Sequence, residues 1–280
     1  MSFFKEILSD SFLDAAKLLP LLFAIYLLVE YLEHKNNNFV HNLFLKSKKS
    51  GAFLGALFGT VPQCGFSVIA SELFSKKAIT AGTLIAIFIA TSDEAIPILI
   101  AHPDRFFDML RLIGIKFVIA VIFGFLIDFF VKTEVKSGET GEEHHFHGNC
   151  ESCEDGIFKS AVIHSLKIFI FIFLVNIILG AAAEYISPFM QFITDRPFLQ
   201  TVIACLFGII PNCAASVVLT ELYLAGKITF SALAGGLCTG AGVGLLVLFR
   251  QNKNQKQNFA ILGTIFLIGV FSGLILSLFQ

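Results

Sequence analysis

The chain has 280 residues, of which 56% are hydrophobic and 15% are charged, whereas an ordinary soluble domain carries about 25% charged residues. The mean hydropathy is +0.81, and apolar runs of about 20 residues, long enough for a helix to cross a bilayer, recur along the whole length. The formal net charge of −1 leaves no basic excess for binding DNA or RNA. These features exclude a water-soluble globular protein and indicate a polytopic membrane protein without a nucleic-acid partner.

Taken in chain order, eight apolar segments are predicted, in two groups of four: residues 15–33, 51–75, 78–101 and 112–131, then 160–183, 199–225, 228–249 and 258–279. The polar stretch between the groups, residues 132–155, contains seven acidic residues, three His and two Cys. We therefore expect a first transmembrane repeat over residues 1–131, a His/Cys-rich loop over residues 132–156 and a second transmembrane repeat over residues 157–280.

The two groups are copies of one another. When residues 58–84 are laid over residues 207–233 at a constant offset of 149, 11 of the 27 aligned positions are identical without a gap. A composition biased in this way would give about two or three identities by chance. The chain is therefore an internal duplication, and the offset gives a residue of the first repeat an equivalent residue in the second, called its mate below.

Both repeats carry helix-breaking residues at matching places. Pro62 and Pro211 each lie near the middle of a second segment, where proline removes a backbone donor and clashes with the preceding turn. The third segments are interrupted at residues 91–97 and 239–242. Irregular backbone inside a membrane is tolerated only within protein or around a water-filled cavity, and paired breaks are typical of a transporter's binding site. The predicted fold class is an all-α polytopic membrane protein built from two repeats with broken helices.

The distribution of Lys and Arg favours re-entrant hairpins. If all eight segments cross the membrane, the 17 Lys and Arg residues outside the segment interiors divide 10 against 7. If the second segment of each group instead returns to its own side, they divide 12 against 5, which is the stronger positive-inside bias. Three crossings then remain in each repeat, so the repeats are expected to be inverted, with both termini outside and the His/Cys loop in the cytoplasm.

Asp93 and Glu94 lie inside the third apolar segment. A carboxylate near the centre of a spanning helix costs about 2.5 to 3.5 kcal/mol on insertion scales, so two adjacent carboxylates require compensation by a bound cation, a proton or a local cavity. We expect them to bind the transported ion together with Ser92. In the alternative interpretation the helix ends near Thr91, and Ser92 or Asp93 merely caps the next helix.

The two predicted hairpin tips carry duplicated polar residues, which are Gln63, Cys64 and Ser67 in the first repeat and Asn212, Cys213 and Ser216 in the second. Inverted symmetry would bring the tips together near the membrane midplane. Thiolates favour soft or borderline ions, whereas carboxylate and amide oxygens favour Mn or Mg, so a mixed set suits a transition metal. Buried Cys and Ser are also ordinary packing residues in membrane helices, and that alternative stays open.

Two further groups of residues are weaker candidates. Glu72 and Glu221 are mates near the ends of their segments. Two interpretations are open for them: ordinary carboxylates at the membrane interface, or a gate or proton-coupling site. Cys205 and Cys238 have no Cys at the equivalent positions, and we expect them to be packing residues.

The loop between the repeats contains possible metal ligands at close spacing, which are His144, His145, His147, Cys150 and Cys153. A further histidine, His164, follows the loop. Imidazole and thiolate at this density indicate metal binding in the cytoplasm, although a single C-x2-C pair is only a moderate signal. A solvated linker is the alternative, and on the opposite side of the membrane the two cysteines could form a disulfide.

These motifs resemble a bacterial membrane family of arsenic efflux proteins, also called manganese transporters or heavy-metal exporters, with about ten spans when each hairpin counts as two half-helices. The resemblance rests on four stretches: Gly59-Thr-Val-Pro-Gln-Cys-Gly-Phe-Ser, Ala90-Thr-Ser-Asp-Glu-Ala-Ile-Pro, His164-Ser-Leu-Lys after the loop, and Ile210-Pro-Asn-Cys-Ala-Ala-Ser with Thr239-Gly-Ala-Gly. Ser165 stands where the family pattern has Thr. The resemblance implies export of a metal or metalloid ion.

The predicted function is therefore that of a secondary transporter, and not an enzyme, which exports a divalent transition metal such as Mn across the bacterial inner membrane. No Walker motif is present, which leaves proton or ion exchange as the drive. The alternatives are a permease for trivalent arsenic or organoarsenicals, a membrane-anchored thiol oxidoreductase using Cys150 and Cys153, and a metal sensor. The expected partners are the metal or metalloid ion and the lipid bilayer, with no permanently bound cofactor and a homo-oligomer left open.

Overall fold

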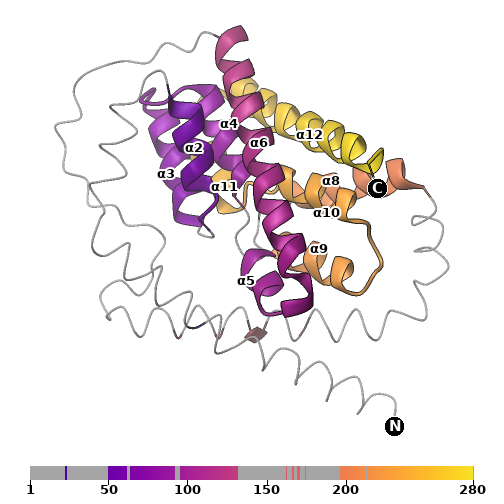
Figure 1. Cartoon of the computed structure of the whole chain (residues 1–280). Helices are drawn as coiled ribbons and strands as arrows, with labels where there is room; N and C mark the ends of the chain where they lie inside the picture. Colours follow the sequence, from indigo (N-terminus) through magenta and orange to yellow (C-terminus); the bar gives the residue numbers. More distant parts are fainter. Residues whose placement is uncertain are drawn as a thin grey trace.

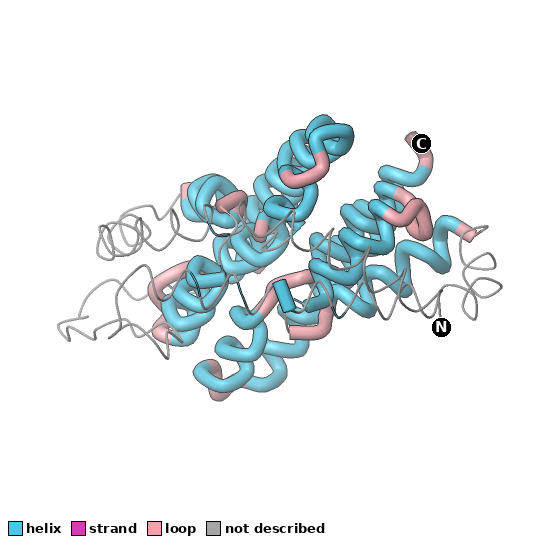
Figure 2. The backbone as a smooth tube through the Cα atoms, turned by 90° about the horizontal axis from the view of Figure 1, so that it is seen from below, coloured by secondary structure: helices cyan, strands magenta, loops and turns pink. Residues whose placement is uncertain are grey.

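The computed structural model describes residues 50–61, 64–91, 95–131, 196–211 and 214–279, together with isolated positions in the first and fifth predicted segments. Within these ranges the chain forms helices joined by short loops, and the described part contains no strand (Figure 2). The loop over residues 132–156 lies outside the described residues.

The described helices occur in two matching series (Figure 1). The first series is α2 Gly51–Gly59, α3 Cys64–Ser75, α4 Ala81–Ala90, α5 Ala95–Ile100, the short 3-10 helix η1 Pro103–Arg105, and α6 Phe106–Phe130. The second series is α8 Pro197–Gly208, α9 Ala214–Leu224, α10 Phe230–Thr239, α11 Val243–Gln251 and α12 Gln255–Ser277. At the offset of 149 each α-helix of the first series overlies one of the second. The predicted breaks coincide with helix ends, because α2, α4, α8 and α10 each stop where a break was expected.

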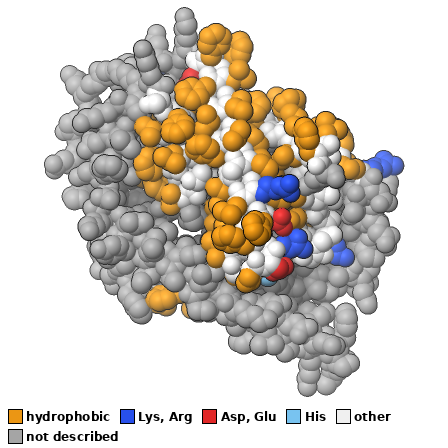
Figure 3. Space-filling view, viewed as in Figure 1, with side chains coloured by type: hydrophobic (Ala, Val, Ile, Leu, Met, Phe, Trp, Pro, Cys, Tyr) orange, Lys and Arg blue, Asp and Glu red, His pale blue; other side chains and the backbone are white. Residues whose placement is uncertain are grey.

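The outer surface of the bundle is apolar. Four helical stretches are long and apolar enough to cross a membrane: Ala81–Ile100, Pro103–Phe130, Phe230–Gln251 and Gln255–Ser277. On α6, Phe107 is 80% exposed and Phe129 is 78% exposed, and hydrophobic side chains gather over much of the described part of the face shown in Figure 3. Contiguous apolar surface of this extent is unfavourable in water and is matched by lipid chains. The prediction of an all-α polytopic membrane protein is confirmed.

The helices pack in the same way within each repeat, and some helices of each repeat also pack on helices of the other repeat. Helices α2, α4 and α6 pack on one another, as do α8, α10 and α12. Helix α3 of the first repeat packs on α11 of the second, and α5 of the first packs on α9 of the second, while α4 and α10 contact each other. At the offset of 149, the pair α3 and α11 corresponds to the pair α9 and α5. In Figure 1, α6 runs up the page and α12 runs down it.

Small residues allow the helices within each repeat to approach closely. A Cβ atom at Gly59 of α2 would lie 2.7 Å from Ala90 Cβ and 2.8 Å from the Ile87 carbonyl oxygen of α4. Its mate Gly208 in α8 is closer still to α10, because a Cβ there would overlap the Gly236 carbonyl oxygen and the Thr239 hydroxyl. Small residues at helix crossings are typical of membrane proteins, in which association depends on van der Waals packing.

Helices α4 and α10 begin at the mated residues Thr80 and Thr229, each of which caps its own first turn with its hydroxyl. A side chain from another helix completes each cap. In the first repeat Asp128 of α6 accepts hydrogen bonds from the Thr80 hydroxyl and from the Gly82 N–H, both at 2.8 Å. In the second repeat the Gln200 amide oxygen accepts from the Thr229 hydroxyl at 2.7 Å and from its N–H at 3.0 Å. Both helices are therefore fixed at their N-terminal ends, with their C-terminal ends directed toward the breaks.

Candidate functional site

The break between α4 and α5 begins at a buried position within the helix bundle. Asp128 marks the N-terminal end of α4, while Lys116 of the same helix α6 contacts Thr91, the residue that ends α4. Twelve residues of helix separate Asp128 from Lys116, or about 18 Å at 1.5 Å per residue, against a hydrocarbon core about 30 Å thick. Thr91 and Ala95, on either side of the break, are 1% and 0% exposed. Buried residues therefore flank the break on both sides.

Lys116 is a buried charged residue at this break that the sequence analysis did not single out. Its side chain is 1% exposed, and its ammonium group donates hydrogen bonds to the Thr91 carbonyl oxygen at 2.5 Å and to the Leu237 carbonyl oxygen at 2.8 Å. Thr91 ends α4 and Leu237 lies in the last turn of α10, so one ammonium group joins the two repeats. The signal was present in the sequence, because an ionisable residue inside an apolar segment is a functional candidate by default.

Ser67, a predicted site residue, is fully buried where α3 packs on α11. A Cβ atom at Gly244 would lie 2.6 Å from Ser67 Cβ, so the two backbones are in close contact. One turn further along α3, the Ser71 hydroxyl lies 2.8 Å from the Ser67 carbonyl oxygen and 2.7 Å from the Gly244 carbonyl oxygen. These contacts join the first predicted hairpin to the start of α11.

Ser216, the mate of Ser67, is 9% exposed and lies beside the break between α10 and α11. A Cβ atom at Gly240, the residue after α10, would be 3.8 Å from the Ser216 hydroxyl oxygen. Gly242, which precedes α11, has a φ of 54°, a left-handed conformation that favours glycine. The structure therefore brings the duplicated pair Ser67 and Ser216 to the two sides of the break between α10 and α11.

Most other predicted site residues lie outside the described residues: Gln63, Ser92, Asp93, Glu94, Asn212, Cys213, His144, His145, His147, Cys150, Cys153 and His164. Cys64 begins α3, but its side chain is also outside the description. Glu72 and Glu221 are half-buried in α3 and α9, and Cys205 and Cys238 are fully buried. Among the described residues, no three His, Cys, Asp or Glu side chains form a group that could hold a metal ion.

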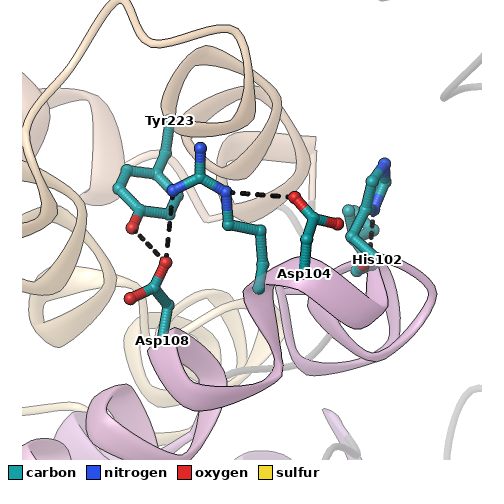
Figure 4. Close-up of polar contacts among 6 residues, drawn as sticks. His102, Asp104, Asp108 and Tyr223 are labelled. Atoms are coloured by element: carbon teal, nitrogen blue, oxygen red, sulfur yellow. Dashed lines mark hydrogen bonds and ion pairs between the residues drawn. The ribbon is translucent and has the colours of Figure 1, made fainter.

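A polar cluster joins the repeats at the N-terminal end of α6 (Figure 4). The Asp108 carboxylate accepts a hydrogen bond from the Tyr223 hydroxyl of α9 at 2.6 Å and pairs with Arg105 at 3.3 Å. The Arg105 guanidinium carbon also lies 5.5 Å from the centroid of the Tyr223 ring, and Arg105 pairs with Asp104 at 3.5 Å. Asp108 is eight residues from Lys116, or about 12 Å along α6. The cluster therefore fixes α6 against the opposite repeat at one end of the membrane region.

The bundle has helices broken in pairs, a buried Lys116 ammonium and hydroxyl groups beside the breaks. In membrane transporters, substrate sites form at such breaks. A comparison with family models narrows this class. Residues 1–190 match the family described as "Putative, 10TM heavy-metal exporter", and the chain belongs to that family. The resemblance noted from the sequence motifs is confirmed, and metal export through a multi-pass membrane protein is the general function that the family supports. Neither curated proteins nor solved structures gave a match.

Proposed function

We propose that this protein is a secondary transporter that exports a divalent transition metal, with Mn as the best candidate, across the bacterial inner membrane. The observation that carries the proposal is the position of the break between α4 and α5. This break begins within the helix bundle, between buried residues and against the opposite repeat, and its sequence contains Asp93 and Glu94. Two carboxylates at that depth require positive charge, and a divalent cation would supply it in addition to the Lys116 ammonium at Thr91.

The proposed ligands combine charged and neutral donors. Asp93 and Glu94 supply the charge, and hydroxyl, amide and thiol groups from the two hairpin tips complete the set: Ser92, Gln63, Cys64, Ser67, Asn212, Cys213 and Ser216. Ser67 and Ser216 lie on the two sides of the other break, between α10 and α11, and the proposal requires the two breaks to lie near each other. Carboxylate and amide oxygens suit Mn, and thiols extend the range to softer ions.

Two accessory roles are proposed for residues away from the break. Glu72 and Glu221 are half-buried mates in α3 and α9, where a carboxylate could couple proton movement to metal movement. The loop ligands His144, His145, His147, Cys150, Cys153 and His164 would collect metal on the cytoplasmic side. Such a loop raises the local metal concentration without forming the pathway.

We also propose that α2–α3 and α8–α9 are re-entrant hairpins in inverted repeats. The rings of Phe58 in α2 and Phe66 in α3 have centroids 5.8 Å apart, although eight residues of continuous helix would separate them by about 12 Å. This proximity supports a bend between the two helices. The opposite directions of α6 and α12 in Figure 1 support the inversion.

Cysteine labelling tests the hairpins. In a cysteine-free background, Ser50→Cys before α2 and Lys77→Cys after α3 should react with a membrane-impermeant maleimide from the same side, because a hairpin returns to its starting face. Both positions are exposed. Lys227→Cys, in the corresponding turn of the inverted repeat, should react from the other side. If Ser50→Cys and Lys77→Cys react from opposite sides, α2 and α3 cross the membrane and the hairpin model is wrong.

A thiol-based permease for trivalent arsenic or organoarsenicals is the second candidate, because Cys64 and Cys213 are duplicated in register. Such a permease would depend on the thiols and tolerate loss of the carboxylates. A thiol oxidoreductase or a metal sensor would not require paired helix breaks.

Metal flux through the purified protein in proteoliposomes distinguishes these functions. We expect saturable Mn²⁺ movement, followed with an internal indicator dye, and no comparable movement of arsenite or methylarsenite. Protein-free liposomes provide the baseline. Movement of arsenicals without Mn²⁺ would support the second candidate, and no flux of either class would support a sensor or an oxidoreductase.

A further inference from the structure

The C-terminal ends of α4 and α10 meet at one point inside the membrane. Each helix has ten residues and is fixed at its N-terminal end by Asp128 or Gln200, as described above. The last carbonyl groups of a helix have no partner within it, and the helix dipole places about half a negative charge there. Because both ends contact the Lys116 ammonium, they form a buried region lined by carbonyl groups, with about one unit of negative charge from the two dipoles.

The Lys116 ammonium occupies this region. Among its contacts are one carbonyl oxygen from each helix end, Thr91 at 2.5 Å and Leu237 at 2.8 Å. At 1% exposure the group is shielded from water. In transporters with broken helices, carbonyl groups at half-helix C-terminal ends are the donors that hold a monovalent coupling ion.

We propose that Lys116 is a tethered substitute for such an ion: its ammonium fills a monovalent-cation site formed by the C-terminal ends of α4 and α10. The wild-type protein should therefore need neither Na⁺ nor K⁺. Removal of the ammonium should empty the site, so that an alkali ion can enter and restore the link between the repeats. This inference concerns a monovalent cation and is independent of which metal is exported.

The chain offers a matched control for Lys116. Its mate is Ile265 in α12, which is also 1% exposed and belongs to a buried hydrophobic cluster. Only the first repeat carries the charge at this position, so the same substitution at the mate changes a buried side chain of similar size without removing an ammonium.

Thermal unfolding of the purified full-length protein in detergent tests the proposal. The melting temperatures of wild type, Lys116→Met and Ile265→Met are compared in choline, Li⁺, Na⁺ and K⁺ chlorides at equal ionic strength. We expect no alkali-ion effect for wild type or Ile265→Met. Lys116→Met should melt about 5 °C lower in choline, because two buried carbonyl groups lose a charged donor, and should recover at least half of that loss in one alkali chloride.

Two outcomes overturn the proposal: Lys116→Met melts like wild type in choline, or it melts lower by the same amount in all four salts. If Lys116→Met does not fold, Lys116→Gln, which keeps a shorter polar donor, gives the same comparison. Wild-type Mn²⁺ flux supplies a measurement without any variant, since a several-fold stimulation by Na⁺ or K⁺ over choline would also overturn the proposal. The melting experiment gives its answer even if Mn²⁺ is not the cargo.

Discussion

Replacing Asp93 with Asn, or Glu94 with Gln, is expected to abolish Mn²⁺ export without lowering the amount of protein in the membrane. A neutral amide is a weaker ligand for a hard or borderline cation than a carboxylate. Loss of one charged interaction costs about 3 kcal/mol, which corresponds to a loss of about 100-fold in binding. The same change removes part of the cost of placing a charge in the bilayer, so expression should stay level or rise. Transport and expression are thus expected to move in opposite directions.

The measurement is Mn²⁺ flux at matched protein levels in proteoliposomes. Asp104→Asn is the matched control, because it makes the same chemical change on a side chain that is 73% exposed at the N-terminal end of α6. It should transport like the parent. If both carboxylate variants also transport like the parent while Cys64→Ser is inactive, the carboxylate mechanism is wrong and the thiol-based permease should replace it.

Gly208→Leu is expected to prevent folding. Any Cβ at this position of α8 would overlap the backbone oxygen of Gly236 and the hydroxyl of Thr239 in α10, and backbone atoms cannot move aside as a flexible side chain can. Overpacking of this kind costs about 3 kcal/mol or more, a large part of a typical folding free energy of about 5–15 kcal/mol. The expected result is loss of the monodisperse peak in size-exclusion chromatography in detergent, together with reduced membrane expression.

Gly263→Leu is the control for that substitution. Gly263 lies within α12, and a Cβ there would meet nothing within 4 Å, so added apolar bulk should be tolerated on the open face of the helix. If Gly208→Leu purifies as well as Gly263→Leu, the close contact of α8 with α10 is incorrect.

The positions of the breaks could be predicted because their signals are local. Pro62, Pro211 and the run from Thr239 to Gly242 act on their own turns of helix, and duplication repeats the signal at a fixed offset. The observed helix ends at Gly59, Ala90, Gly208 and Thr239 agree with those signals.

The contacts between segments could not be predicted in the same way. Asp128 and Gln200 cap the N-terminal ends of α4 and α10. They are not mates, because the offset pairs Asp128 with Ser277 and Gln200 with Gly51, so the duplication does not predict that they have the same role. Lys116 was present as a lone charge in an apolar run, yet its partners Thr91 and Leu237 are 25 and 121 residues away. The hydrogen bond between Tyr223 and Asp108 likewise forms only because α9 packs against the opposite repeat.

The exchange of helices between the repeats has a consequence for the history of the chain. Because α3 packs on α11 and α5 packs on α9, a single repeat would leave these surfaces uncovered. A one-repeat ancestor could cover them by pairing with a second copy of itself. Gene fusion would then have freed the two halves to diverge, and the charge at Lys116 opposite Ile265 at its mate is the kind of asymmetry that a homodimer cannot acquire.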